Sequence, residues 1–149
     1  MKTIHLKAEG FWKNRTKLPD YGGIYFVYAV TMDEKNQVCD KRLLYIGETD
    51  NIHERHNGTK EKPAKHEHYD DFINELGDSE VLKYVTAEVK GTEKERKEIQ
   101  NALIFRNNPP VNSASTKSYN GEDIEISFST EDNINSPNDV IVRKGENRE

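Results

Sequence analysis

Two strand-like stretches decide the fold of this chain: YGGIYFVYAV at residues 21–30 and RLLYIGET at residues 42–49. Both are rich in β-branched and aromatic residues, a composition that is typical of strands. The segment between them, TMDEKNQVCDK, is polar and suits a turn. We therefore expect the two stretches to pair as a β-hairpin.

Helix and strand signals alternate after this hairpin. Helices are predicted in NIHERH (51–56), AKHEHYDDFINELG (64–77) and TEKERKEIQNALIFRNN (92–108), and strands in VLKYVTAEV (81–89) and, at a sheet edge, DIEISFST (123–130). Asp50 is a candidate N-cap for the first helix and Thr92 for the last. This order predicts a small α/β sandwich, in which a central three-stranded, mainly antiparallel sheet is flanked by helices.

The length of 149 residues suits one compact domain. We expect a strand and loop extension in residues 1–20 and the main domain in residues 21–128. Residues 129–149 are rich in Ser, Asn, Asp and Glu, so they are expected to form an acidic, flexible tail.

The net charge of −5 comes entirely from residues 121–149, because acidic and basic side chains are equal in number before them. A dedicated nucleic-acid binder usually shows a basic excess, so tight nonspecific DNA binding is disfavoured, although a local basic patch is still allowed. The single cysteine excludes an internal disulfide bond and a four-cysteine zinc site. The chain has neither an apolar run of about 18 residues nor the apolar core of a signal peptide. Cytoplasmic residence without membrane contact is therefore expected.

Two tripeptides within the hairpin form a recognisable motif together with two later segments. Gly23-Ile24-Tyr25 precedes Tyr45-Ile46-Gly47, a predicted helix then carries Arg55, and ALIFRNNPPVN supplies Pro109 and then Asn112. In this order and with these spacings, the segment from Gly22 to Asn112 resembles the GIY-YIG nuclease superfamily.

The resemblance implies hydrolysis of nucleic-acid phosphodiester bonds with one divalent metal, Mg²⁺ or Mn²⁺. In this scheme Tyr25 accepts a proton from the attacking water, and Tyr45 hydrogen-bonds the phosphate or that water. Arg55 stabilises the charge that develops on the phosphate oxygens. Asn112 either fixes the loop after the last helix or contacts the phosphate.

The chain departs from the family pattern at the metal. By the spacing common in the family, counted back from Asn112, the resemblance puts the metal-binding carboxylate at Gln100, whose amide has no charge to hold a hard cation. Glu98 is the alternative ligand, although two residues along a helix lie about 200° apart around its axis. Three explanations stay open: lost catalysis with retained binding, an active site that uses Glu98, and a deliberately introduced substitution.

A second departure lies after Arg55. Thr59 stands where many relatives carry a histidine that assists the tyrosine. His56 is adjacent in sequence but is expected to point elsewhere on an ideal helix, and His66 or His68 are candidates to reach back from the following loop.

The sequence thus predicts a GIY-YIG-type endonuclease, whose activity Gln100 would impair. The alternative is a catalytically inactive module of the same fold that binds nucleic acid or a protein. DNA is favoured over RNA as the partner, and the acidic tail is a candidate surface for a protein partner.

Overall fold

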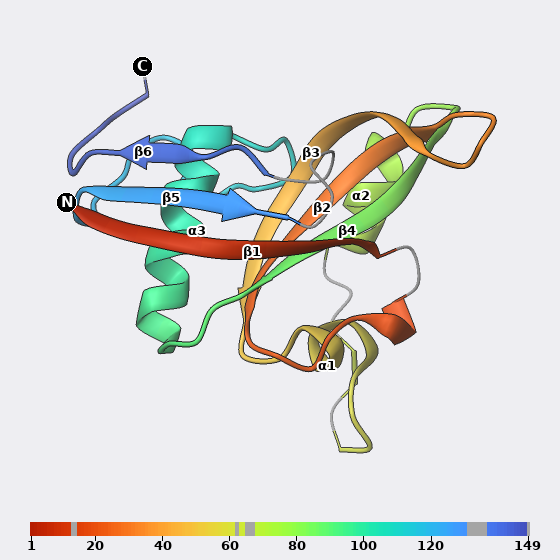
Figure 1. Cartoon of the computed structure of the whole chain (residues 1–149), viewed down its shortest axis with the longest axis horizontal. Helices are drawn as coiled ribbons and strands as arrows, with labels where there is room; N and C mark the ends of the chain where they lie inside the picture. The colour runs from red at the N-terminus through yellow and green to blue at the C-terminus, as the bar shows by residue number, and fades with distance from the viewer. Residues whose placement is uncertain (13–14, 62, 65–67, 131–136, 149) are drawn as a thin grey trace.

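The computed structural model describes residues 1–12, 15–61, 63–64, 68–130 and 137–148 (Figure 1). Its elements in chain order are β1 (Lys2–Trp12), the 3-10 helix η1 (Arg15–Lys17), β2 (Gly23–Met32), β3 (Val38–Thr49), α1 (Ile52–Asn57), α2 (Tyr69–Glu75), β4 (Glu80–Glu88), α3 (Glu93–Asn107), β5 (Ile124–Ser129) and β6 (Val140–Val142).

The sheet is larger than the sequence predicts. It is a mixed, curled, six-stranded sheet in the order β3-β2-β4-β1-β5-β6 (Figure 1). The predicted three-stranded sheet flanked by helices is therefore wrong, because β1 pairs antiparallel with β4 on one side and parallel with β5 on the other. The expected strand at residues 123–130 exists as β5, but it lies inside the sheet between β1 and β6 and not at an edge.

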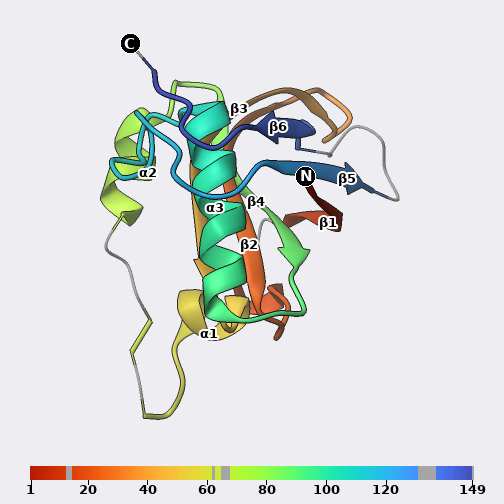
Figure 2. The same cartoon turned by 90° about the vertical axis from the view of Figure 1, so that its left-hand side faces the viewer.

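The predicted hairpin is confirmed: β2 and β3 pair antiparallel, with Tyr25 opposite Gly47. β2 also pairs with β4, and its residues 23–30 are all buried. Ile24 and Phe26 pack into one hydrophobic cluster with α3, whereas Tyr25 and Val27 pack into another with α1 and α2. The sheet is therefore covered by different helices on its two faces (Figures 1 and 2).

The helix termini follow local sequence signals. Thr92 caps α3 as predicted, since its hydroxyl accepts a hydrogen bond from the Glu95 N–H at 3.2 Å. α1 is capped by Asn51 and not by Asp50: the Asn51 side chain accepts from the Glu54 N–H at 3.0 Å. None of the helices in the described ranges is long and apolar enough to cross a membrane.

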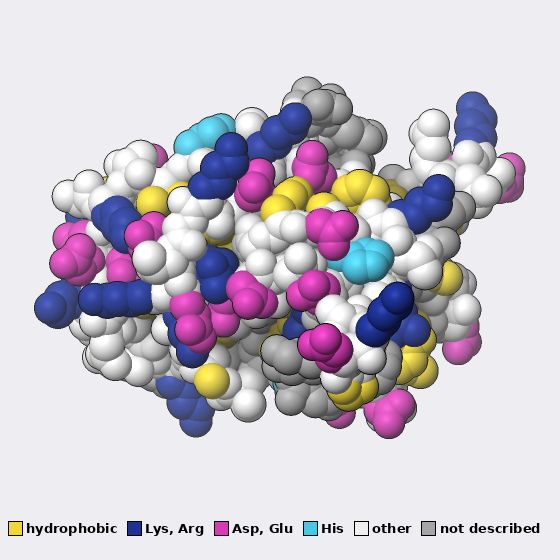
Figure 3. Space-filling model, turned by 90° about the horizontal axis from the view of Figure 1, so that it is seen from below, with side chains coloured by type: hydrophobic (Ala, Val, Ile, Leu, Met, Phe, Trp, Pro, Cys, Tyr) yellow, Lys and Arg dark blue, Asp and Glu magenta, His cyan; other side chains and the backbone are white. Residues whose placement is uncertain are grey.

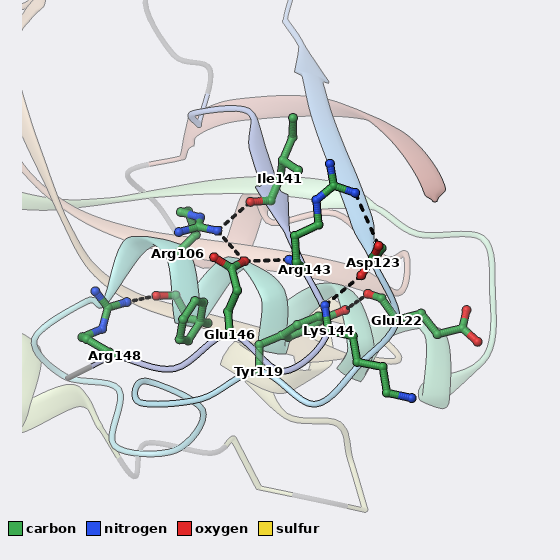
Figure 4. Close-up of polar contacts among 10 residues, drawn as sticks. Arg106, Tyr119, Glu122, Asp123, Ile141, Arg143, Lys144, Glu146 and Arg148 are labelled. Atoms are coloured by element: carbon green, nitrogen blue, oxygen red, sulfur yellow. Dashed lines mark hydrogen bonds and ion pairs between the residues drawn. The ribbon is translucent and has the colours of Figure 1, made fainter.

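The last described segment, residues 137–148, packs against the domain. It contributes β6, which pairs antiparallel with β5, and Val140 and Val142 are buried. Figure 4 shows the Glu146 carboxylate accepting hydrogen bonds from Arg106 on α3, at 2.8 Å, and from the Arg143 N–H, at 2.6 Å. This part of the expected tail packs onto the sheet because the alternating residues Val140 and Val142 of β6 are buried. The pattern is short, and the acidic composition of the segment obscures it in the sequence. Residues 131–136 lie outside the described residues.

Candidate functional site

Four of the predicted site residues line one cavity. Tyr25 on β2, Tyr45 on β3, Arg55 on α1 and Gln100 on α3 border a space of about 340 Å³. The cavity lies where the edge strand β3 meets α1 and α3, so residues that are 75 positions apart in the sequence come together there. Its lining also includes Gly47, Thr49 and four charged residues, Glu48, Asp50, Glu93 and Arg96.

Tyr25 is held by its neighbours across the hairpin. Its ring lies over Gly47, where an added Cβ would overlap the ring carbon and hydroxyl of Tyr25. The Tyr25 side chain is almost completely buried, with the Tyr45 ring centroid 6.2 Å away. Glycine at position 47 is therefore required for this placement of the phenol, which explains physically why Tyr25 and the second tripeptide occur together.

Beside this cavity lies a smaller aromatic pit, which shares Tyr25, Tyr45 and Arg55 with it. His56 lines the pit and is buried, with its ring centroid 4.8 Å from that of Tyr25. The expectation that His56 points away is wrong, because the short helix α1 packs its last turn directly against β2. His56 also hydrogen-bonds the Ile52 carbonyl through Nδ1 at 2.8 Å, which fixes the orientation of the ring.

The other residues considered near the tyrosines lie in different places. His68 packs against Tyr45, with ring centroids 4.9 Å apart, whereas His66 lies outside the described residues. Thr59 is exposed, and its hydroxyl accepts a hydrogen bond from the Glu61 N–H. Burial raises the pKa of Tyr84 in the pit, and the nearby Arg15 only partly opposes this effect, so the phenol stays protonated at neutral pH.

Asn112 does not line the cavity; it binds the backbone of the strand that carries the second tripeptide. The Ile46 N–H donates to the Asn112 side-chain oxygen at 2.9 Å, and the Asn112 amide donates to the Ile46 carbonyl at 3.0 Å. The Gln100 amide also points to that carbonyl, at 3.5 Å. Because β3 is an edge strand, these contacts satisfy polar groups that no neighbouring strand pairs.

Glu98 lies on the other side of α3, as the helical angle between positions 98 and 100 requires. It borders a separate space of about 610 Å³ together with Tyr119, and its carboxylate lies 3.8 Å from the Lys2 ammonium. Glu98 therefore does not share a cavity with Tyr25 and Arg55.

The residues at the cavity do not provide the metal-binding carboxylate that the resemblance implies at position 100. Gln100 carries no charge, and Glu48 is already engaged by Arg96, whose Nε donates to the carboxylate at 3.1 Å. The two side chains are only 13% and 11% exposed, so the carboxylate and the guanidinium compensate each other's charge inside the site. Within the described ranges, no group of three or more His, Cys, Asp or Glu side chains is arranged to hold a metal ion.

The sequence reasoning missed this ion pair. Glu48 directly follows Tyr45-Ile46-Gly47, and Arg96 lies one helical turn before Gln100 on the same face of α3. The positions of both residues relative to the motif were therefore visible in the sequence, but the partners are 48 residues apart and only the fold brings them together.

Comparisons of the chain with protein-family models, with curated proteins and with solved structures found no match.

Proposed function

We propose that this protein is a GIY-YIG-like module that binds a nucleic-acid phosphodiester group without cleaving it. The observation that carries the proposal is the Arg96–Glu48 ion pair beside the neutral Gln100, in the cavity shared with Tyr25 and Arg55. Glu48 is held by Arg96 and Gln100 carries no charge, so neither is set to hold a metal cation, whereas the Arg55 guanidinium can contact a phosphate without one.

The groups in the cavity suit a single phosphate. Arg55 offers a planar set of donors to phosphate oxygens, and the hydroxyl groups of Tyr25 and Tyr45 are further donors on the same wall. Three carboxylates, from Glu48, Asp50 and Glu93, also line the cavity. The carboxylates outnumber the two guanidinium groups of Arg55 and Arg96, so the lining is no basic channel and a phosphate would be held by directed hydrogen bonds from Arg55 and the tyrosines.

The surface around the site has the same mixed character. On the face where α1 and the first turns of α3 lie, cationic and acidic side chains are interspersed (Figure 3). Such a surface limits the number of phosphates that one duplex segment can contact, and hence its affinity. DNA is the first partner to test. The proposed location is a reducing compartment such as the cytoplasm, because Cys39 is an exposed free thiol.

Replacing Arg55 with alanine is expected to lower the affinity for a short oligonucleotide about tenfold, because one charge-assisted phosphate contact is lost. The slope of log affinity against log salt concentration should fall by about one contact. Fluorescence anisotropy over a salt series measures both quantities, and EDTA should leave them unchanged. Lys94→Ala is the matched control, because it removes one exposed positive charge that does not line this cavity. Equal effects of the two variants would contradict the proposal.

A metal-dependent endonuclease is the second candidate, and the convergence of Tyr25, Tyr45 and Arg55 favours it. Plasmid nicking in Mg²⁺ or Mn²⁺ separates the two candidates. The binding module leaves supercoiled plasmid intact with either metal. The endonuclease nicks it in a reaction that EDTA stops, and Gln100→Glu, which restores a carboxylate, accelerates that reaction.

A further inference from the structure

A partly exposed aromatic surface adjoins the phosphate cavity. Tyr45, His68, Tyr69 and Phe72, here called the aromatic platform, line the pit beside the cavity together with Arg15 and Arg55. Tyr45 connects the two spaces, since it lines both and lies 5.4 Å from Phe72 between ring centroids. The platform and the phosphate site therefore form one continuous surface.

The outer part of the platform is not buried by the fold. Tyr69 is 38% exposed, and the His68 side chain is 32% exposed. The Arg15 guanidinium lies 5.4 Å from the centroid of the Tyr69 ring, so a positive charge also stands at the outer edge. Tyr69 begins α2 and keeps part of its ring in contact with solvent, so the outer rim of the platform offers a ring face to a planar ligand.

We infer that the partner of this site is single-stranded nucleic acid, with a base stacked on Tyr69 and His68 and the adjoining phosphate at Arg55. This inference rests on the proposed function. Stacking on aromatic rings contributes affinity without requiring a basic surface, because every base has a π-face. In a duplex the bases stack on one another and cannot reach the platform, and the interspersed charges of Figure 3 offer a duplex few phosphate contacts.

The first experiment compares ligands on the full chain. Fluorescence anisotropy is measured with labelled single-stranded DNA and RNA of about 12 nucleotides, within the range that one binding domain covers, and with a blunt DNA duplex of equal length. Both single strands are expected to bind about tenfold or more tightly than the duplex, which is the factor that one stacked base contributes. The RNA and DNA arms show whether the 2′-hydroxyl matters.

The second experiment tests the platform itself. Tyr69→Ala should lower single-strand affinity about tenfold while leaving the salt slope unchanged, because stacking releases no counterions. Tyr69→Phe keeps the ring and should bind like the wild type. Ile73→Ala is the matched control, since Ile73 is an exposed apolar residue one turn later on α2. Thermal unfolding of each variant identifies any loss of affinity that comes from loss of structure.

The outcomes separate this inference from the proposal on which it rests. The inference is overturned if the duplex binds as tightly as the single strands, or if the Tyr69→Ala variant has the same affinity as the Ile73→Ala variant. Either result leaves the proposed phosphate site unaffected. Absence of binding to every nucleic acid overturns both.

Discussion

Arg96→Ala is expected to lower the free energy of unfolding by about 3 kcal/mol, because it leaves the Glu48 carboxylate buried without its partner. Arg96 and Glu48 are only 11% and 13% exposed, and Arg96 also donates to the Gly91 carbonyl at 3.2 Å. Removing one partner of such a pair costs more than the pair itself contributes, since the remaining charge has lost both water and counter-charge. Urea unfolding followed by circular dichroism measures the change.

A double-mutant cycle separates the ion pair from the packing of the long arginine side chain. Glu48→Gln in the Arg96→Ala background removes the buried charge, so it should recover a large part of the lost stability. Lys97→Ala is the surface control: it breaks an exposed pair with Glu93 on the same helix and should leave the unfolding midpoint nearly unchanged. A cycle in which the two substitutions simply add would show that Arg96 and Glu48 do not interact.

Asn112→Ala is expected to lower the free energy of unfolding by about 2–3 kcal/mol, because two hydrogen bonds to the edge strand β3 are lost together. The Ile46 N–H is left without an acceptor, whereas its carbonyl keeps the weaker contact from Gln100 at 3.5 Å. The strand that carries Tyr45 and Gly47 loses its outer support, so oligonucleotide affinity should fall as well. Chemical denaturation and anisotropy on the same variant measure both effects.

The Asn112→Asp variant keeps the hydrogen bond from the Ile46 N–H and removes the one to the Ile46 carbonyl. A carboxylate still accepts from the Ile46 N–H, but it cannot donate to the Ile46 carbonyl, and it places negative charge against that oxygen. The variant should therefore also be destabilised. Wild-type stability in both Asn112 variants would show that neither contact supports β3.

The placement of several candidate residues around one cavity follows from the sequence, and particular residues show why. Tyr25 and Tyr45 belong to one hairpin, so once β2 and β3 are recognised as strands, a short connection nearly fixes their relative position. Arg55 lies on the next short helix and has little freedom to lie elsewhere. The placement of Glu98 and Gln100 on different faces also follows from helical geometry alone. The orientation of His56 does not follow from helical geometry, because it depends on how closely α1 packs against β2.

The sequence by itself determined the local elements: the hairpin, the Thr92 cap of α3, and the two faces of that helix that carry residues 98 and 100. These features depend on contacts between near neighbours, where propensity and periodicity decide. Only the tertiary structure placed β1 between β4 and β5, joined Arg96 to Glu48 across 48 residues, and brought Asn112 to Ile46 across 66. Pairings over such distances depend on burial and hydrogen bonding in the whole sheet, which no short stretch of the chain encodes.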